Sequence, residues 1–269
     1  MVTYSAPTEV KAFSVYQNSW QSISYPSAQA AVFDSRDGYA TLSAGGGTDM
    51  VWFSALTGRL VRRQSPNPVS VTFGPNCAVL QSAGAVTGYS PATDAFVALP
   101  AIGTGSLLLA QGSFGCYALI DDGISLTAFN GLTSRVTPAP NYVPFLAYTL
   151  GDTAAFAAGP LEMAFSALRD QWYLAPTSPS VTVMPMFEGI VRSVSGGYEA
   201  FSARTGTFSM LSTGSGALVT QAQGALTAFV TTAGGIDAFD PRLGRWVHRS
   251  EEHTSELQSR QYLVCRLLL

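Results

Sequence analysis

Seven copies of one short motif constrain the fold of this chain more than any other feature. Each copy has an aromatic residue, a small polar residue directly after it, and a large apolar residue seven positions after the aromatic. The aromatic and apolar residues of the copies are Phe13 with Trp20, Phe53 with Leu60, Tyr89 with Phe96, Phe129 with Val136, Phe165 with Trp172, Phe201 with Phe208, and Phe239 with Trp246. The copies recur every 36 to 40 residues, which is typical of repeat architectures whose units bury their cores against one another.

Each repeat unit contains four short runs of β-forming residues separated by turn residues. In the unit at 101–140 these runs are 106–111, 116–121, 124–130 and 135–138, and Asp121-Asp122-Gly123 stands between the second and the third. In the last unit they are 217–223, 226–231, 236–240 and 245–248. Four consecutive runs joined by tight turns predict one four-stranded antiparallel sheet per unit, with the motif on the third strand, the turn and the fourth strand.

The positions around each aromatic residue carry further expectations. Five residues after it stands a residue that tolerates a left-handed turn conformation, namely Asn18, Gly58, Asp94, Ser134, Asp170, Gly206 or Gly244. The residue directly before it is small in six copies, and Trp52 is the exception. We therefore expect the aromatic and apolar residues to face each other across a hairpin, and the packing around Trp52 to differ from that in the other units.

The motif resembles the kelch repeat. The stretches Tyr89 to Pro100 and Phe239 to Trp246 are similar to its pattern of aromatic, Asp-Pro, Thr, Trp and Leu-Pro, although kelch repeats are longer and carry a more regular glycine doublet. The units also resemble those of quinoprotein-type propellers. The resemblance implies an all-β fold, a seven-bladed β-propeller of four-stranded antiparallel blades. Since only twelve residues precede Phe13, we expect the first blade to be incomplete, with its missing strand supplied from the other end of the native chain.

The end of the chain does not resemble the rest. Residues 249–269 resemble the in-frame translation of a common sequencing adapter, and we expect this segment to be a non-native tail. The expected domain is therefore a β-propeller over residues 1–248. We also expect the native protein to continue beyond His248 with the strand that completes the first blade.

Composition excludes several classes of protein. The 14 Lys and Arg residues oppose 17 Asp and Glu, for a net charge of −3, and no basic cluster of the kind that binds nucleic acid is present. No apolar run approaches the roughly 20 residues of a membrane helix, so no membrane association is expected. Cys77 and Cys116 occupy equivalent strands of neighbouring units, and we expect them to lie too far apart for a disulfide, as buried free thiols. Two such thiols leave the cellular compartment undetermined.

The repeat region contains little catalytic chemistry. Its single histidine, His248, excludes the multi-histidine metal sites of copper-radical oxidases, and we predict no catalytic residue, metal or cofactor. Arg62-Arg63 is a candidate anion contact, although neighbouring strand residues point to opposite faces, so one of the two would take part. Candidate binding residues are the carboxylates and aromatics expected on the loops, each also open to a turn or packing role: Asp49, Trp52, Asp121, Asp122, Tyr142, Phe187 and Glu188.

These observations favour a non-catalytic scaffold that binds a protein or a glycan through loops on one face. Two alternatives remain open at this point. One is a propeller enzyme, a hydrolase or lyase that uses paired carboxylates. The other is that the chain is one module of a longer multidomain protein.

Overall fold

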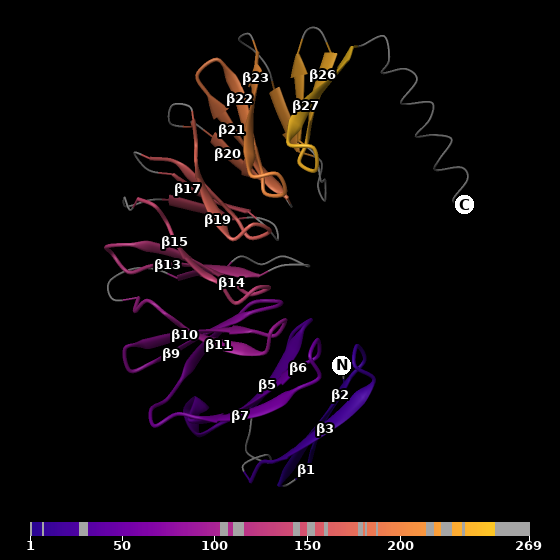
Figure 1. Cartoon of the computed structure of the whole chain (residues 1–269), viewed down its shortest axis with the longest axis vertical. Helices are drawn as coiled ribbons and strands as arrows, with labels where there is room; N and C mark the ends of the chain where they lie inside the picture. Colours follow the sequence, from indigo (N-terminus) through magenta and orange to yellow (C-terminus); the bar gives the residue numbers. More distant parts are fainter. Residues whose placement is uncertain are drawn as a thin grey trace, which may run out of the picture. The chain divides into compact units, whose positions relative to one another are not determined.

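The protein has an all-β fold of the β-propeller type, built from consecutive antiparallel sheets (Figure 1). The computed structural model describes residues 2–250 except 7, 27–31, 103–106, 110–115, 142–145, 150–153, 159–160, 177–179, 181, 187, 214–217, 222–227 and 233–234. Within these residues one sheet has three strands and six sheets have four. The predicted four-stranded antiparallel sheets are therefore confirmed, and the first sheet has three strands among the described residues.

The chain divides into two compact units, which are described separately. The first comprises residues 1–144 together with 151–153 and 170–172, and the second comprises 145–150, 154–169 and 173–269. The predicted domain boundary at 248 falls within the last strand, which runs to Ser250, and residues 251–269 lie outside the described residues.

The first unit contains the three-stranded sheet and three four-stranded sheets, in which strands adjacent in sequence are also neighbours in the sheet. Their strands are β1 (Val2–Ala6), β2 (Glu9–Ser14) and β3 (Ser19–Ser24); β4 (Val32–Ser35), β5 (Tyr39–Ala44), β6 (Asp49–Ser54) and β7 (Leu60–Gln64); β8 (Ser70–Phe73), β9 (Ala78–Ser82), β10 (Ala85–Ser90) and β11 (Ala95–Leu99); and β12 (Leu107–Leu109), β13 (Tyr117–Asp121), β14 (Leu126–Asn130) and β15 (Val136–Pro138). A short 3₁₀ helix, η2 (Gly45–Gly47), lies between β5 and β6.

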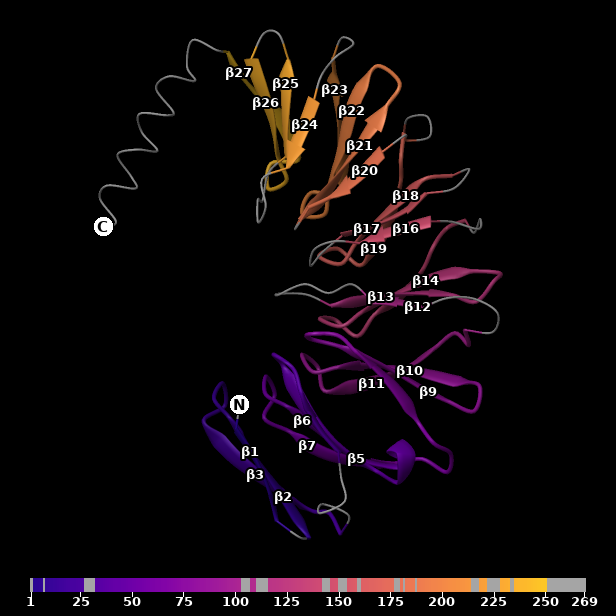
Figure 2. The same cartoon turned by 180° about the vertical axis from the view of Figure 1, so that it is seen from behind.

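The second unit repeats the plan in three further sheets (Figure 2). Their strands are β16 (Leu146–Thr149), β17 (Ala154–Ala158), β18 (Met163–Ser166) and β19 (Gln171–Leu174), the last of which belongs in part to the first unit; β20 (Thr182–Pro185), β21 (Gly189–Val194), β22 (Gly197–Ser202) and β23 (Thr207–Ser212); and β24 (Leu218–Gln221), β25 (Ala228–Thr232), β26 (Gly235–Asp240) and β27 (Arg245–Ser250).

The repeat motif forms the hairpin between the last two strands of each sheet, which are the third and fourth strands of the four-stranded sheets, as predicted, and β2 and β3 in the first sheet. Phe53 pairs with Leu60, Tyr89 with Phe96, and the equivalent residues pair in the other hairpins for which the register is described. All seven predicted turn residues have positive φ, between 47° at Asn18 and 71° at Gly58. Only glycine and a few polar residues adopt this conformation at low cost, which explains the residue types found there.

In the five copies where the small polar residue of the motif is serine, it links one sheet to the next. Its hydroxyl donates a hydrogen bond to a backbone carbonyl in the motif turn of the following sheet, and it also accepts one from the backbone amide three residues on. The links with their O···O distances are Ser14 to Ala55 (2.5 Å), Ser54 to Pro91 (2.6 Å) and Ser90 to Gly131 (2.5 Å) in the first unit, and Ser166 to Ala203 (2.5 Å) and Ser202 to Pro241 in the second. All five serines are fully buried, so each hydroxyl satisfies polar groups that have lost their contact with water.

Apolar clusters fill the spaces between consecutive sheets within each unit. In the first unit, Trp52 of β6 packs with Leu80 of β9 and Tyr89 of β10. In the second, Phe156, Ile190 and Phe201 form an equivalent cluster. Because each sheet is too small to bury its own apolar face, the repeats are stabilised mainly by their neighbours.

The expectation for the cysteines is wrong, because Cys77 and Cys116 form a disulfide with a Cα–Cα distance of 5.5 Å. The two residues directly precede β9 and β13, and Gly74 and Gly131 lie close to them. A Cβ placed on Gly131 would lie 2.5 Å from the Cβ of Cys77, and one on Gly74 would lie 2.6 Å from the Cys116 sulfur. Glycine at these two positions lets the backbones approach closely enough for the bond to form.

Candidate functional site

Each four-stranded sheet presents two edges at which a ligand could bind. The motif turns and the turns between the first and second strands form one edge, named here the motif edge. The turns between the second and third strands, with the connections from one sheet to the next, form the other, named the loop edge. The buried serine links hold the motif edge together, whereas the turns at the loop edge differ in length, being longer at 45–48 and 122–125 than at 83–84 and 195–196. Variable loops on a fixed scaffold are the usual location of binding residues.

Asp49, the first predicted binding residue, lies at the loop edge at the start of β6. Its carboxylate accepts two hydrogen bonds from Arg62, at 2.9 Å from Nε and 2.8 Å from Nη2. These bonds raise the pKa of Arg62 above its ordinary value. The Asp49 carbonyl also accepts a hydrogen bond from the Tyr25 hydroxyl at 2.9 Å. Asp49 therefore has a bidentate partner within its own sheet.

Trp52, three residues further along β6, is fully buried. Its ring contacts those of Tyr89 and Phe96, with centroid distances of 4.6 and 5.5 Å, and it stacks on Tyr39 at 6.1 Å. Its indole N–H has no hydrogen-bond partner among the described residues. The structure thus places Trp52 in the core between two sheets. Packing here therefore differs from that in the repeats with a small residue at this position.

Asp121 and Asp122 form the turn at the loop edge between β13 and β14. Asp121 accepts a hydrogen bond from the Gly123 amide at 2.8 Å, and Asp122 accepts bonds from the Ile124 and Ser125 amides. The hydrogen bonds from Ser125 and Ile124 hold the pKa of Asp122 below its ordinary value. In this arrangement both carboxylates stabilise their own turn.

The remaining predicted residues do not join the others. Glu188 lies between β20 and β21, on the motif edge, where it pairs with Arg204 at 2.8 Å. Tyr142 and Phe187 lie outside the described residues. Among the described residues, Asp49, Asp121 and Asp122 share the loop edge of the first unit, and Glu188 belongs to the opposite edge of a sheet in the second unit.

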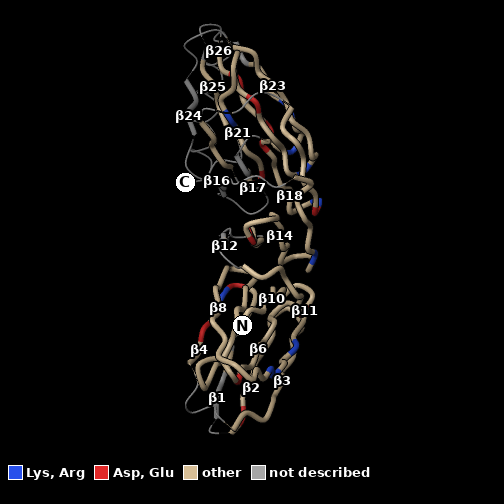
Figure 3. Tube along the Cα trace, turned by 90° about the vertical axis from the view of Figure 1, so that its left-hand side faces the viewer, with Lys and Arg blue, Asp and Glu red and all other residues tan. Residues whose placement is uncertain are grey.

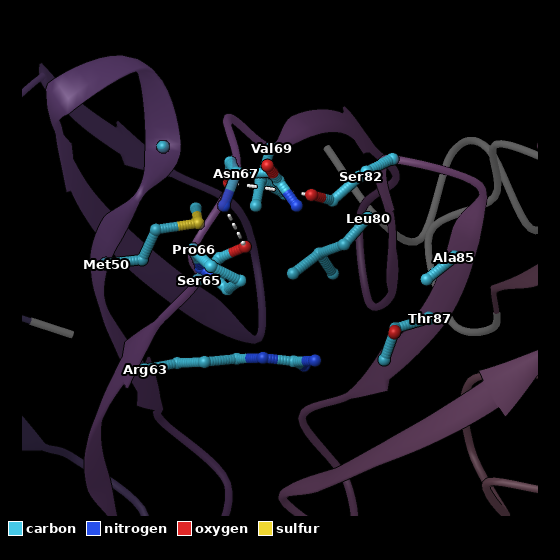
Figure 4. A pocket seen from close by; sticks show the side chains of 12 residues that line it. Met50, Arg63, Ser65, Pro66, Asn67, Val69, Leu80, Ser82, Ala85 and Thr87 are labelled. Carbon is cyan, nitrogen blue, oxygen red and sulfur yellow. Dashed lines mark hydrogen bonds between the residues drawn. The ribbon is translucent and has the colours of Figure 1, made fainter.

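A pocket of about 220 Å³ opens at the loop edge of the first unit, between sheet β4–β7 and sheet β8–β11 (Figure 4). We name it the Arg63 pocket. The turn that contains Gly47, the connection from Ser65 to Val69, and the β9–β10 turn form its walls together with residues of the adjoining strands. The lining residues are Gly47, Met50, Arg63, Ser65, Pro66, Asn67, Val69, Leu80, Ser82, Ala83, Ala85 and Thr87.

The two neighbouring arginines of β7 have different environments. Arg62 is paired with Asp49, whereas Arg63 points to the other face of the strand and lines the pocket. The guanidinium of Arg63 lies 4.6 Å from the ring centroid of Phe96, and its Nη1 is buried without a hydrogen-bond partner among the described residues. The predicted alternation is therefore confirmed. Of the two arginines, Arg63 is the one that has no ionic partner within the described residues.

Sequence reasoning missed a buried ionic cluster in the second unit. Arg192 of β21 is 1% exposed and pairs with Glu199 of β22 and with Glu162. Glu162 in turn accepts hydrogen bonds from the amide and hydroxyl of Ser180. The available signal was a single charged residue in the otherwise uncharged run of β21, which is mostly apolar. Burial of such a charge requires a partner, and here two carboxylates supply it.

Comparisons with known proteins leave the family open. No protein-family model and no curated protein matches the sequence. Among solved structures, the chain is similar to Hsv2 from Kluyveromyces lactis, with 9% identity, 88% of each chain covered and a TM-score of 0.31. It is similar to a protein of unknown function from Desulfotomaculum acetoxidans, with 13% identity, 91% of this chain and 92% of the other covered, and a TM-score of 0.31.

A third similar structure is apo AztD from Citrobacter koseri, with 12% identity, 89% of this chain and 79% of the other covered, and a TM-score of 0.34. Scores this low do not transfer a function. In the ranges that the structure describes, no helix is long and apolar enough to cross a lipid bilayer.

Proposed function

We propose that this protein is a kelch-like β-propeller scaffold that binds a protein or a glycan through its loop edge. The observation that supports this most is that the two edges of the sheets differ in structure. At the motif edge the motif serines join the sheets, and the positive-φ residues form the turns. The loop edge carries the Arg63 pocket and turns that differ from sheet to sheet.

The described carboxylates favour a scaffold over a hydrolase or lyase. Asp49, Glu188, Glu199 and Asp237 each pair with a basic side chain, and Asp122 accepts hydrogen bonds from its own turn. A pair of catalytic carboxylates would instead face a shared cleft at roughly 5–10 Å from each other. Each of these five acids has a structural role that accounts for its position.

Two experiments with the full chain test the proposal. One measures binding to a glycan array. The other cross-links the chain to proteins of its native source and then titrates it with each purified candidate. The variant Ala85→Trp adds a large side chain at the loop edge, where Ala85 is exposed. The matched control Asp37→Trp adds the same side chain at the motif edge of the neighbouring sheet, where Asp37 is exposed. We expect Ala85→Trp to weaken binding and Asp37→Trp to leave it unchanged. Equal effects of the two variants, or turnover of a glycan without stable binding, would contradict the proposal.

A further inference from the structure

The Arg63 pocket contains a positive charge that has no counter-charge among the described residues. Arg63 is the single charged residue among the described residues that line the pocket, and no described carboxylate lies within ion-pair distance of it. Charged residues are sparse along the described part of the trace (Figure 3). Burial lowers the pKa of Arg63 from its ordinary value, which reflects the poor compensation of its charge. A guanidinium nevertheless stays protonated in proteins, so an incoming anion would find it charged.

The position of Arg63 is fixed by its neighbours. It stands opposite Met50 in the β6–β7 ladder, and its guanidinium lies against the face of Phe96. Stacking on an aromatic ring holds the plane of a guanidinium and leaves its edges to donate hydrogen bonds. In Figure 4 the side chain extends from β7 along the pocket towards Thr87 of β10. The charge is therefore held in place before any ligand arrives, which lowers the entropic cost of binding.

The rest of the lining combines hydroxyl groups with an apolar wall. The Ser65 and Ser82 hydroxyls are already engaged with the Asn67 backbone, at 3.3 and 3.5 Å. The Thr87 hydroxyl lines the pocket and has no hydrogen-bond partner in the part of the chain that the structure describes. Buried Met50 and Leu80 supply apolar surface at the same site. The lining thus offers one cation, a hydroxyl donor and an apolar surface.

We propose that the Arg63 pocket binds the carboxylate of a small aliphatic acid or of a peptide, with Arg63 as the cationic partner and Thr87 as a second donor. A single negative charge matches a single guanidinium, whereas a phosphate dianion would leave one charge without compensation. The apolar wall suits a short alkyl chain attached to the carboxylate. This inference goes beyond the proposed function, since a free acid would bind whether or not the loop edge also holds a macromolecule.

Calorimetric titration of the full chain with pentanoate, and with its uncharged isostere pentanamide, tests the charge requirement. A second arm compares a tripeptide ending in valine with its C-terminal amide, which separates the two sources of the carboxylate. We expect saturable binding of pentanoate or of the free tripeptide, and no binding of either amide. Equal binding of acid and amide, absence of binding in both arms, or binding of sulfate or phosphate as tight as that of the acid would overturn the proposal.

Variants assign the binding to this pocket. Arg63→Met removes the charge but keeps the length of the stem, and we expect it to weaken carboxylate binding roughly 10- to 100-fold. Arg62→Met, the matched control, makes the same change in net charge on the opposite face of β7 and is expected to leave affinity within about twofold. If Arg63→Met does not fold, Thr87→Val provides the test, with a loss of roughly threefold to tenfold expected. Unchanged affinity in a folded Arg63→Met would refute the assignment.

Discussion

Two junctions between sheets of the first unit follow one plan and differ in their packing. The first junction joins sheet β4–β7 to sheet β8–β11, and the second joins sheet β8–β11 to sheet β12–β15. Both carry the serine link, from Ser54 to Pro91 in the first and from Ser90 to Gly131 in the second. The residue before the motif aromatic is Trp52 in the first and Gly88 in the second. This pair of residues marks the difference between the two interfaces.

The second junction is closed by close contact and by a covalent bond. A Cβ on Gly88 would lie 2.7 Å from the ring of Phe129, and the Cys77–Cys116 disulfide joins the two sheets. The first junction instead contains a large indole, the Arg63 pocket, and buried nitrogens of Trp52 and Arg63 that have no partner among the described residues. Unsatisfied polar groups cost stability, and proteins tend to retain them where they serve binding. These features give the second junction a structural role and are consistent with the binding site proposed at the first.

The largest effect is expected at the tryptophan of the first junction. Trp52→Ala removes a fully buried ring packed on Tyr89 and Phe96, and should lower the free energy of unfolding by about 3–5 kcal/mol. Trp52→Phe keeps most of the packing and removes the N–H without an acceptor, so its cost should stay below about 1.5 kcal/mol. Urea denaturation followed by circular dichroism measures both. Similar losses in the two variants would show that the indole nitrogen has a partner.

The disulfide of the second junction should have the next largest effect on stability. It links residues 39 positions apart, and its reduction should lower the free energy of unfolding by about 2–4 kcal/mol. Urea denaturation with and without a phosphine reductant measures this difference. The double variant Cys77→Ser/Cys116→Ser is the control and should not respond to the reductant. Titration of three free thiols in the denatured, non-reduced protein, instead of the single thiol of Cys265, would contradict the bond.

Close contact at Gly88 gives a smaller effect with an unusual sign. Alanine normally stabilises a strand relative to glycine by roughly 0.5–1 kcal/mol. At Gly88 its Cβ would press on the ring of Phe129, so Gly88→Ala should cost about 1–3 kcal/mol. The double variant Gly88→Ala/Phe129→Leu should lose less than the sum of the two single variants. Additive losses in this cycle would show that the second junction has room for the methyl group.

The smallest effect concerns the pH dependence of the first junction. Burial raises the pKa of the Asp94 carboxyl above its ordinary value of 3.8, although Tyr89 and Arg59 act in the opposite direction. The folded state therefore binds the proton more tightly than the unfolded state, and this residue's contribution to stability falls as pH rises from 3.8 through the raised pKa. In Asp94→Asn, which tolerates the same positive φ, this part of the slope should vanish. A slope unchanged by the substitution, measured by urea denaturation across that range, would refute the assignment.

Much of the fold could be predicted because each repeat unit encodes it locally. The motif places an aromatic, a left-handed turn residue and an apolar partner at fixed spacings, so the hairpins follow from residue types alone. The disulfide could not be predicted in the same way, because the Cys77–Cys116 distance depends on how two sheets pack. The close approach of these sheets depends on Gly74 and Gly131. Nothing in the sequence distinguishes these two glycines from other loop glycines.

The candidate site was predictable to a smaller extent. Alternation along β7 predicted that Arg62 and Arg63 face opposite sides, but not which of them a carboxylate would pair. Asp49, Asp121 and Asp122 were expected as ligand contacts, and in the structure they bond to their own sheet or turn. Partners of this kind depend on side-chain geometry, which the spacing of residues does not specify.

Hydrogen exchange measured by mass spectrometry tests the difference between the two junctions most directly. In the oxidised protein we expect the amides of β13 and β14, next to the disulfide, to exchange roughly tenfold or more slowly than those of β5 and β6. Reduction should remove most of that difference by accelerating exchange in β13 and β14. Equal or greater protection of β5 and β6 in the oxidised protein, with no change in β13 and β14 on reduction, would contradict this account.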